Sequence, residues 1–259
     1  MAKGWAKFPY PDKQYSQTAA TLKKAWARLH RGDQEPLPKD AAVIEAWLAF
    51  HAGDFAKAAE MGLAAGGAGI TAANKATAIY ANYLEENEKK KLALFEEVAA
   101  RAEQQQAGEP KNANAFYWQA YALGRYAQGI SIVKALAQGI GGKVKASLET
   151  AIKLAPKHAD AHIALAAYHA EVIDKVGAMI GGLTYGARKE TALKLYDTAL
   201  KLMPDSAIAR IEYANGLVML EGKKGLARAE KLYAEAAAGE PMDAMERLDV
   251  ELAKTELED

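Results

Sequence analysis

Histidine side chains are the first place to look for chemistry, because imidazole serves both as a general base and as a metal ligand. The chain has five histidines, and His158 and His162 lie four residues apart with Asp160 between them. On one helix face, two histidines at this spacing could share a metal ion. Pro156 lies two residues before His158 and marks a turn, so this histidine is expected at a helix start, in a capping or surface role. We therefore predict no metal site.

Other catalytic patterns are also missing from the sequence. None of the four serines lies in a G-x-S-x-G or S-x-x-K setting, the patterns of common serine nucleophiles. Phosphate-binding loops end in G-K-[ST] or follow a strand. The glycine-rich stretch at 66–69 has neither feature. Glu171 and Asp174 lie three residues apart, a spacing that is equally common on solvated helices. We predict that the protein is not an enzyme and has no cofactor.

Composition narrows the classes of partner. The 33 basic and 33 acidic residues cancel, which argues against a general electrostatic attraction to nucleic acid. The chain has no cysteine, so disulfides and thiolate metal sites are excluded. No apolar stretch approaches the roughly 18 residues of a membrane span, and the first residues lack a signal-peptide pattern. These features predict a cytoplasmic protein with no membrane span and no nucleic-acid partner.

An internal repeat in the sequence predicts the helices on which any site would lie. The string AIKLAP at 151–156 returns 48 residues later as ALKLMP at 199–204. The openings of the two units also match, as ALGRY at 122–126 and ALAAY at 164–168, and each unit carries a double glycine. A third unit repeats the spacing of small, aromatic and proline residues. The two sets in register are Ala192, Tyr196, Ala199, Pro204 and Ala229, Tyr233, Ala236, Pro241.

These residues resemble the tetratricopeptide repeat (TPR), an antiparallel helix pair with small residues at the helix contacts, an aromatic in the second helix and a proline after it. The resemblance is clearest over 115–241. It implies an all-α fold, an antiparallel helix-hairpin array of the α-solenoid type. The small residues, Gly124 among them, are expected to let helix axes approach to roughly 8–10 Å. The units are longer than the usual repeat of about 34 residues.

Helical periodicity continues outside the clear repeats. Residues 1–40 are predicted as an N-terminal helical arm, continuous with an array over 41–259 of about five hairpins. The strings LHRGD at 29–33 and FHAGD at 50–54 each indicate a helix end followed by a cap. After Pro241, an amphipathic pattern predicts a C-terminal capping helix. Its apolar face is Met245, Leu248 and Leu252, and its polar face is Asp243, Glu246, Asp249 and Glu251.

Two insertions account for the extra length of the repeats. Residues 130–142 and 172–182 each follow the first helix of a unit, have apolar residues at helical spacing and end in Gly-Gly. Equivalent insertions in stacked repeats project from the same edge, so these two could cover each other or line a cavity. The candidate apolar wall is Ile130, Val133, Ile173, Val176 and Ile180. Polar groups that could orient a ligand are Tyr126, Tyr168, His169 and Tyr185.

The resemblance implies a function class as well. We expect a non-enzymatic scaffold or adaptor that binds a protein partner. The alternative is an accessory protein that binds a small apolar ligand between the two insertions, since the long units are also similar to the TPR component associated with tripartite solute transporters. In TPR modules that clamp a terminal carboxylate, Lys, Asn and Arg line the groove, and here only Asn215 matches. The aromatics of residues 117–126 could anchor a partner or form core.

Overall fold

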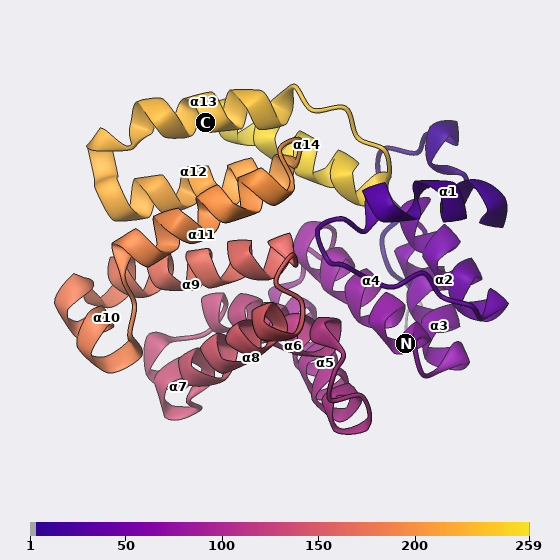
Figure 1. Cartoon of the computed structure of the whole chain (residues 1–259), viewed down its shortest axis with the longest axis horizontal. Coiled ribbons are helices and arrows are strands. Elements are labelled where there is room, and N and C mark those ends of the chain that lie inside the picture. The colour runs from indigo at the N-terminus through magenta and orange to yellow at the C-terminus, as the bar shows by residue number, and fades with distance from the viewer. Residues whose placement is uncertain (1–3, 259) are drawn as a thin grey trace. The chain divides into compact units, whose positions relative to one another are not determined.

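The computed structural model describes residues 4–258, except for the side chains of Ile132, Val133 and Leu136. Within this range the chain is helical and has no strand (Figure 1), which confirms the all-α prediction. The contacts divide it into two compact units, which are described one at a time below. The first unit comprises residues 4–30, 34–155 and 242–245, and the second comprises 31–33, 156–241 and 246–258.

The first unit contains three antiparallel hairpins, formed by α2 with α3, α4 with α5, and α6 with α8. A short 3-10 helix, Lys13–Tyr15, precedes them. The helices are α1 (Ala19–Leu29), α2 (Ala41–His51), α3 (Phe55–Ala65), α4 (Gly69–Tyr83), α5 (Glu88–Gly108), α6 (Ala113–Gln128), α7 (Ile132–Ala137) and α8 (Ile140–Leu154). The insertion at 130–142 supplies α7 and the first turn of α8.

The second unit contains two more hairpins, formed by α9 with α11 and α12 with α13. Its helices are α9 (Ala159–Val176), α10 (Ala178–Tyr185), α11 (Lys189–Leu202), α12 (Ala207–Glu221) and α13 (Leu226–Ala237), and most of α14 (Ala244–Glu258). A 3-10 turn, Gly222–Lys224, joins α12 to α13. Over the described residues, the two units together therefore hold the expected five hairpins and C-terminal helix.

Polar residues at helix starts explain where several of these helices begin. Asp54 precedes α3 and accepts a hydrogen bond from the backbone N–H of Lys57 at 3.2 Å. Ser206 precedes α12 and accepts one from Ala209 at 3.2 Å. Such caps satisfy N–H groups that the first turn of a helix leaves without partners. Gly53 has φ +86° just before Asp54, which confirms the glycine stop and cap predicted from FHAGD.

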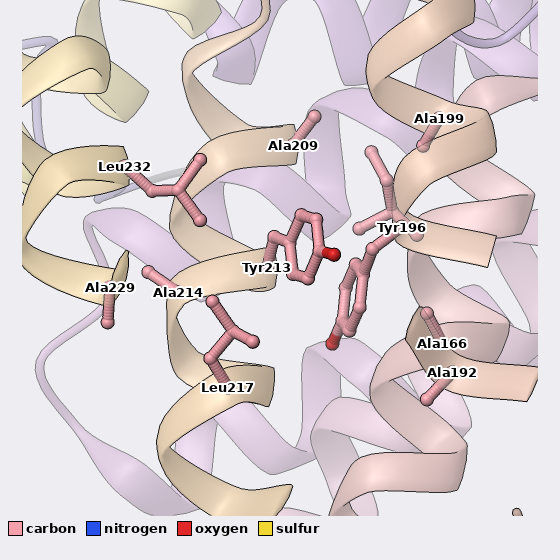
Figure 2. Close-up of a cluster of buried hydrophobic side chains, with 11 residues drawn as sticks. Ala166, Ala192, Tyr196, Ala199, Ala209, Tyr213, Ala214, Leu217, Ala229 and Leu232 are labelled. Carbon is pink, nitrogen blue, oxygen red and sulfur yellow. The ribbon is translucent and has the colours of Figure 1, made fainter. Parts of the chain in front are cut away.

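The repeat register forms the core of the second unit. Ala192, Tyr196 and Ala199 of α11 are all buried, at 0 to 1% exposure. Figure 2 shows the Tyr196 ring lying between α11 and α12, beside Tyr213. The two rings stack with centroids 4.8 Å apart and planes 12° apart. Gly216 leaves room for Tyr196, because a Cβ there would lie 2.5 Å from its ring. The small and aromatic positions of the α11 repeat therefore pack as predicted.

We expect Ala199→Leu to destabilise the protein by about 1–3 kcal/mol, because Ala199 is fully buried and the added atoms would overpack the contact between helices. Glu230→Ala on the exposed face of α13 is the control and should change stability by less than about 0.5 kcal/mol. Urea denaturation of both variants tests this. Equal midpoints would contradict the repeat register.

The expected roles of several glycines were wrong. Gly124 makes no close helix contact, since a Cβ there would meet nothing within 4 Å. The double glycines do not end the insertions: Gly141-Gly142 lies in the first turn of α8 and Gly181-Gly182 lies inside α10. The breaks come from glycines in left-handed conformations, Gly139 (φ +63°), Gly177 (φ +79°) and Gly186 (φ +64°). A positive φ is costly for other residues.

The C-terminal helix is partly as predicted. Leu248 is buried, and Leu252 packs against a cluster of Ile211, Ala236 and Ala253 in the second unit. Asp243 and Asp249, however, are not on an outer polar face, because their exposures are only 4% and 3%. The amphipathic pattern could not reveal this burial, since it gives no information on a distant polar partner.

Candidate functional site

The three most exposed large apolar side chains among those described lie on one helix. This helix is α10, the short helix after α9 (Figure 1). Leu183, Met179 and Ile180 are 85%, 76% and 51% exposed. The helix, with sequence AMIGGLTY, has no charged residue. Large apolar side chains grouped on a surface are typical of interaction sites. We define these three residues as the α10 apolar face.

Glycines at both ends and in the middle of α10 set its position against α9. Gly177 and Gly186 have positive φ and let the chain leave α9 and return toward α11. Gly181 is buried, and a Cβ there would lie 3.3 Å from the Val172 side chain and 3.8 Å from that of Ile173. Gly181 therefore allows α10 to lie close to α9, while the α10 apolar face remains exposed.

Tyr168 and His169 of α9 bond to the backbone around the end of α10. The Tyr168 hydroxyl donates to the carbonyl of Tyr185 at 3.4 Å. The backbone N–H of Arg188 donates to Nδ1 of His169 at 3.3 Å. A bond from the Ala187 N–H to the Gly181 carbonyl, at 2.9 Å, completes the turn. Both side chains are buried, so in this structure they fix the segment that follows α10.

The remaining predicted residues of this insertion lie along the same hairpin. Ile173 and Val176 of α9 are half-buried, and Ile180 belongs to the α10 apolar face. Met179 and Leu183 are two surface residues that the sequence analysis missed. The signal in the sequence was an eight-residue stretch without charge, but periodicity alone did not show which side of so short a helix faces α9.

The predicted residues of the other insertion belong to the first unit. Tyr126 on α6 is buried, and the Lys134 ammonium lies 5.5 Å from the centroid of its ring. Ile130 is half-buried. The side chain of Val133 lies outside the described residues. Because the two insertions belong to separate units, a cavity lined by both stays a prediction.

Asn215 has a partner within its own hairpin. Its side-chain oxygen accepts a hydrogen bond from the Tyr233 hydroxyl, which joins α12 to α13. Burial, together with the nearby Glu256 and Glu212 carboxylates, raises the pKa of Tyr233 to about 12. The hydroxyl therefore stays protonated and donating at neutral pH.

Of the aromatics on α6, Tyr117, Trp118 and Tyr126 are buried and form core.

Of the histidine pair, His158 takes the capping role predicted for it. His158 caps α9, with its Nδ1 accepting from the backbone N–H of Ala161 at 3.1 Å. Nε2 of His162 donates to the carbonyl of Pro156 at 3.0 Å.

Within residues 4–258, no three His, Asp or Glu side chains are grouped to hold a metal ion. Over the same range, no helix is both long and apolar enough to span a bilayer.

Comparison with solved structures identifies a similar fold. The crystal structure of a thermophilic TPR protein from Thermus thermophilus superposes with a TM-score of 0.57 at 15% sequence identity. The match covers 83% of this chain and 97% of the other. No protein-family model and no curated protein matches the sequence. The chain therefore has a TPR-like fold.

Proposed function

We propose that this protein is a non-enzymatic scaffold that binds a protein partner and that the α10 apolar face is the docking surface. The observation that carries the proposal is the exposure of Leu183, Met179 and Ile180 on one short helix. Burying apolar surface stabilises a complex by about 25 cal/mol per Å² before the costs of association. Transfer of these three side chains from water into an interface would therefore favour complex formation.

The contacts between α9 and α10 hold α10 in place before any partner binds. The bonds from Tyr168 and to His169 fix the end of α10, and Gly181 fixes its distance from α9. A surface ordered before binding loses less conformational entropy in the complex. Methionine on such a surface adapts to irregular partner pockets because its side chain is unbranched. We infer that the partner offers an apolar groove that receives α10.

Charges next to α10 favour a protein over an anionic membrane. Glu171 and Asp174 at the end of α9 accompany Lys175, and Lys175 lies 3.7 Å from the carboxylate of Glu171. Beyond α10, Arg188 and Lys189 are followed by Glu190. Segments that bind anionic lipid have an excess of Lys and Arg, which this hairpin lacks. Binding to vesicles with a third of phosphatidylserine should therefore be absent, and saturable vesicle binding would overturn the choice of partner.

The test replaces the two most exposed side chains, in Met179→Ser with Leu183→Ser. Both are largely solvated, so the free energy of unfolding should change by less than about 0.5 kcal/mol. The partner is first identified in the source cell by chemical crosslinking to the parent protein and is then purified. Its affinity for the double variant, measured by calorimetry, should be at least about tenfold lower than for the parent, equivalent to roughly 1.4 kcal/mol.

Leu257→Ser is the matched control, because Leu257 is an apolar residue of the same type, 45% exposed, on α14 of the same unit. This variant should keep the parent's affinity. Equal losses from both variants would show that general surface polarity, and not the α10 apolar face, governs binding.

A further inference from the structure

The leading segment, residues 4–11, is ordered without regular secondary structure. Its sequence GWAKFPYP contains two prolines, Pro9 and Pro11. Proline has no backbone N–H and pushes the residue before it away from helical geometry. The segment is therefore kept out of a helix by its own sequence and bends at Pro9 and Tyr10. Its side chains provide its attachment to the rest of the first unit.

Trp5 provides the first attachment. Its ring stacks on that of Tyr80 in α4, with centroids 4.0 Å apart and planes 5° apart. The backbone N–H of Ala6 donates to the Tyr80 hydroxyl at 3.2 Å. That hydroxyl in turn donates to the carboxylate of Glu85 at 3.1 Å. Burial raises the pKa of Tyr80, which keeps this donor protonated.

Phe8 provides the second attachment and is the most deeply buried residue of the segment, at 8% exposure. Its ring meets those of Phe55 and Tyr15 edge to face, at centroid distances of 6.2 and 6.3 Å. Gly53 makes the seat possible: it has φ +86°, and a Cβ there would lie 2.7 Å from the Phe8 ring. The receiving surface is thus shaped around an aromatic side chain.

The rest of the segment faces solvent. Ala6, Lys7, Pro9 and Tyr10 are exposed, whereas Trp5 is half-buried and Phe8 is buried. The segment is thus held by two aromatic side chains three residues apart and by one backbone hydrogen bond. A few anchors of this kind carry most of the binding energy of many interfaces. We define the receiving surface by Gly53, Phe55, Tyr80 and Glu85 and call it the aromatic-anchor surface.

We propose that the aromatic-anchor surface is a peptide-binding site that the leading segment occupies in cis. When that segment leaves, the surface accepts a peptide with two aromatic residues three positions apart. The site is in the first unit and does not depend on the docking surface of α10. The leading segment then acts as an inhibitor, because a tether of this length gives it an effective concentration in the millimolar range.

The experiment keeps the whole chain and frees the segment by cutting. A specific protease site is inserted between Pro11 and Asp12, which are both exposed, so that buried Tyr15 stays with the body of the protein. After cleavage the released peptide is removed by dialysis. Fluorescence anisotropy then follows a labelled GWAKFPYP peptide added back to the cut protein, with the same peptide carrying Trp5→Ala and Phe8→Ala as the control.

The proposal expects saturable binding of the labelled peptide to the cut protein, at least tenfold weaker for the double-alanine peptide. The uncut protein should bind the labelled peptide at least tenfold more weakly than the cut protein does. A full-length variant with Trp5→Ala and Phe8→Ala should bind it as the cut protein does.

Three results would overturn the proposal. The cut protein could remain folded by circular dichroism and fail to bind the labelled peptide. The uncut protein could bind as well as the cut one. The first unit could unfold once the segment is removed, and the full-length double-alanine variant could unfold with it; this would make the segment a part of the core and not a resident ligand.

Discussion

We expect Tyr196→Ala to destabilise the protein by about 3–5 kcal/mol, the range for removing a large aromatic side chain from a core. Tyr196 is 1% exposed and stacks on Tyr213 at 4.8 Å. Gly216 already stands against its ring, so the neighbouring helix backbone would have to collapse to fill the cavity. The free energy of unfolding of the second unit is measured by urea denaturation, with amide hydrogen exchange in α11 and α12 as the readout.

Lys194→Ala is the control for this change, because Lys194 lies on the same helix two residues away and is exposed. Its loss should cost less than about 0.5 kcal/mol. A similar small cost for Tyr196→Ala would mean that α11 and α12 do not pack through the repeat tyrosine.

The second large effect is expected at a buried chain of polar groups in the first unit. His51 donates from Nδ1 to the carboxylate of Asp243 at 2.6 Å. Nε2 of His51 lies 3.2 Å from Nε2 of His30, so the two rings are joined by a hydrogen bond. All three residues are 4% exposed or less. Asp243→Ala leaves the His51 donor without its carboxylate, so we expect a loss of about 3 kcal/mol.

Asp205→Ala is the matched control for this second effect. Asp205 also pairs with a basic side chain, Arg31 of the same unit, but the carboxylate is 48% exposed. An exposed pair contributes about 0–1 kcal/mol. Urea denaturation should therefore separate the two variants clearly. Equal small losses would contradict a structural role for the buried chain.

The architecture could be predicted because the features that determine it repeat along the sequence. The spacing of Ala192, Tyr196 and Ala199 returns at Ala229, Tyr233 and Ala236, and close helix packing needs small residues at regular intervals. Helix ends were also local: Gly53 and Asp54 are adjacent, and their stop and cap need no distant partner.

The site was harder to predict because its determinants are not local. The face that α10 exposes depends on which glycine lies against Val172, and Gly181 looked like a helix break in the sequence alone. The partner of His51 is 192 residues away at Asp243, so no motif could reveal it. The leading segment was assigned to a helical arm over 1–40, and its attachment to Tyr80 and Phe55 depends on contacts across the first unit.

Site-specific photo-crosslinking tests whether the protein docks its partner through α10. A photoreactive amino acid replaces Leu183, the most exposed apolar residue of the α10 apolar face, in the living source cell. A second protein carries it at Glu230, which is exposed on α13 of the same unit. We predict one protein crosslinked at position 183 and absent at position 230, with a lower yield at position 183 when Met179→Ser is added. No protein at position 183, or the same proteins at both positions, would contradict this prediction.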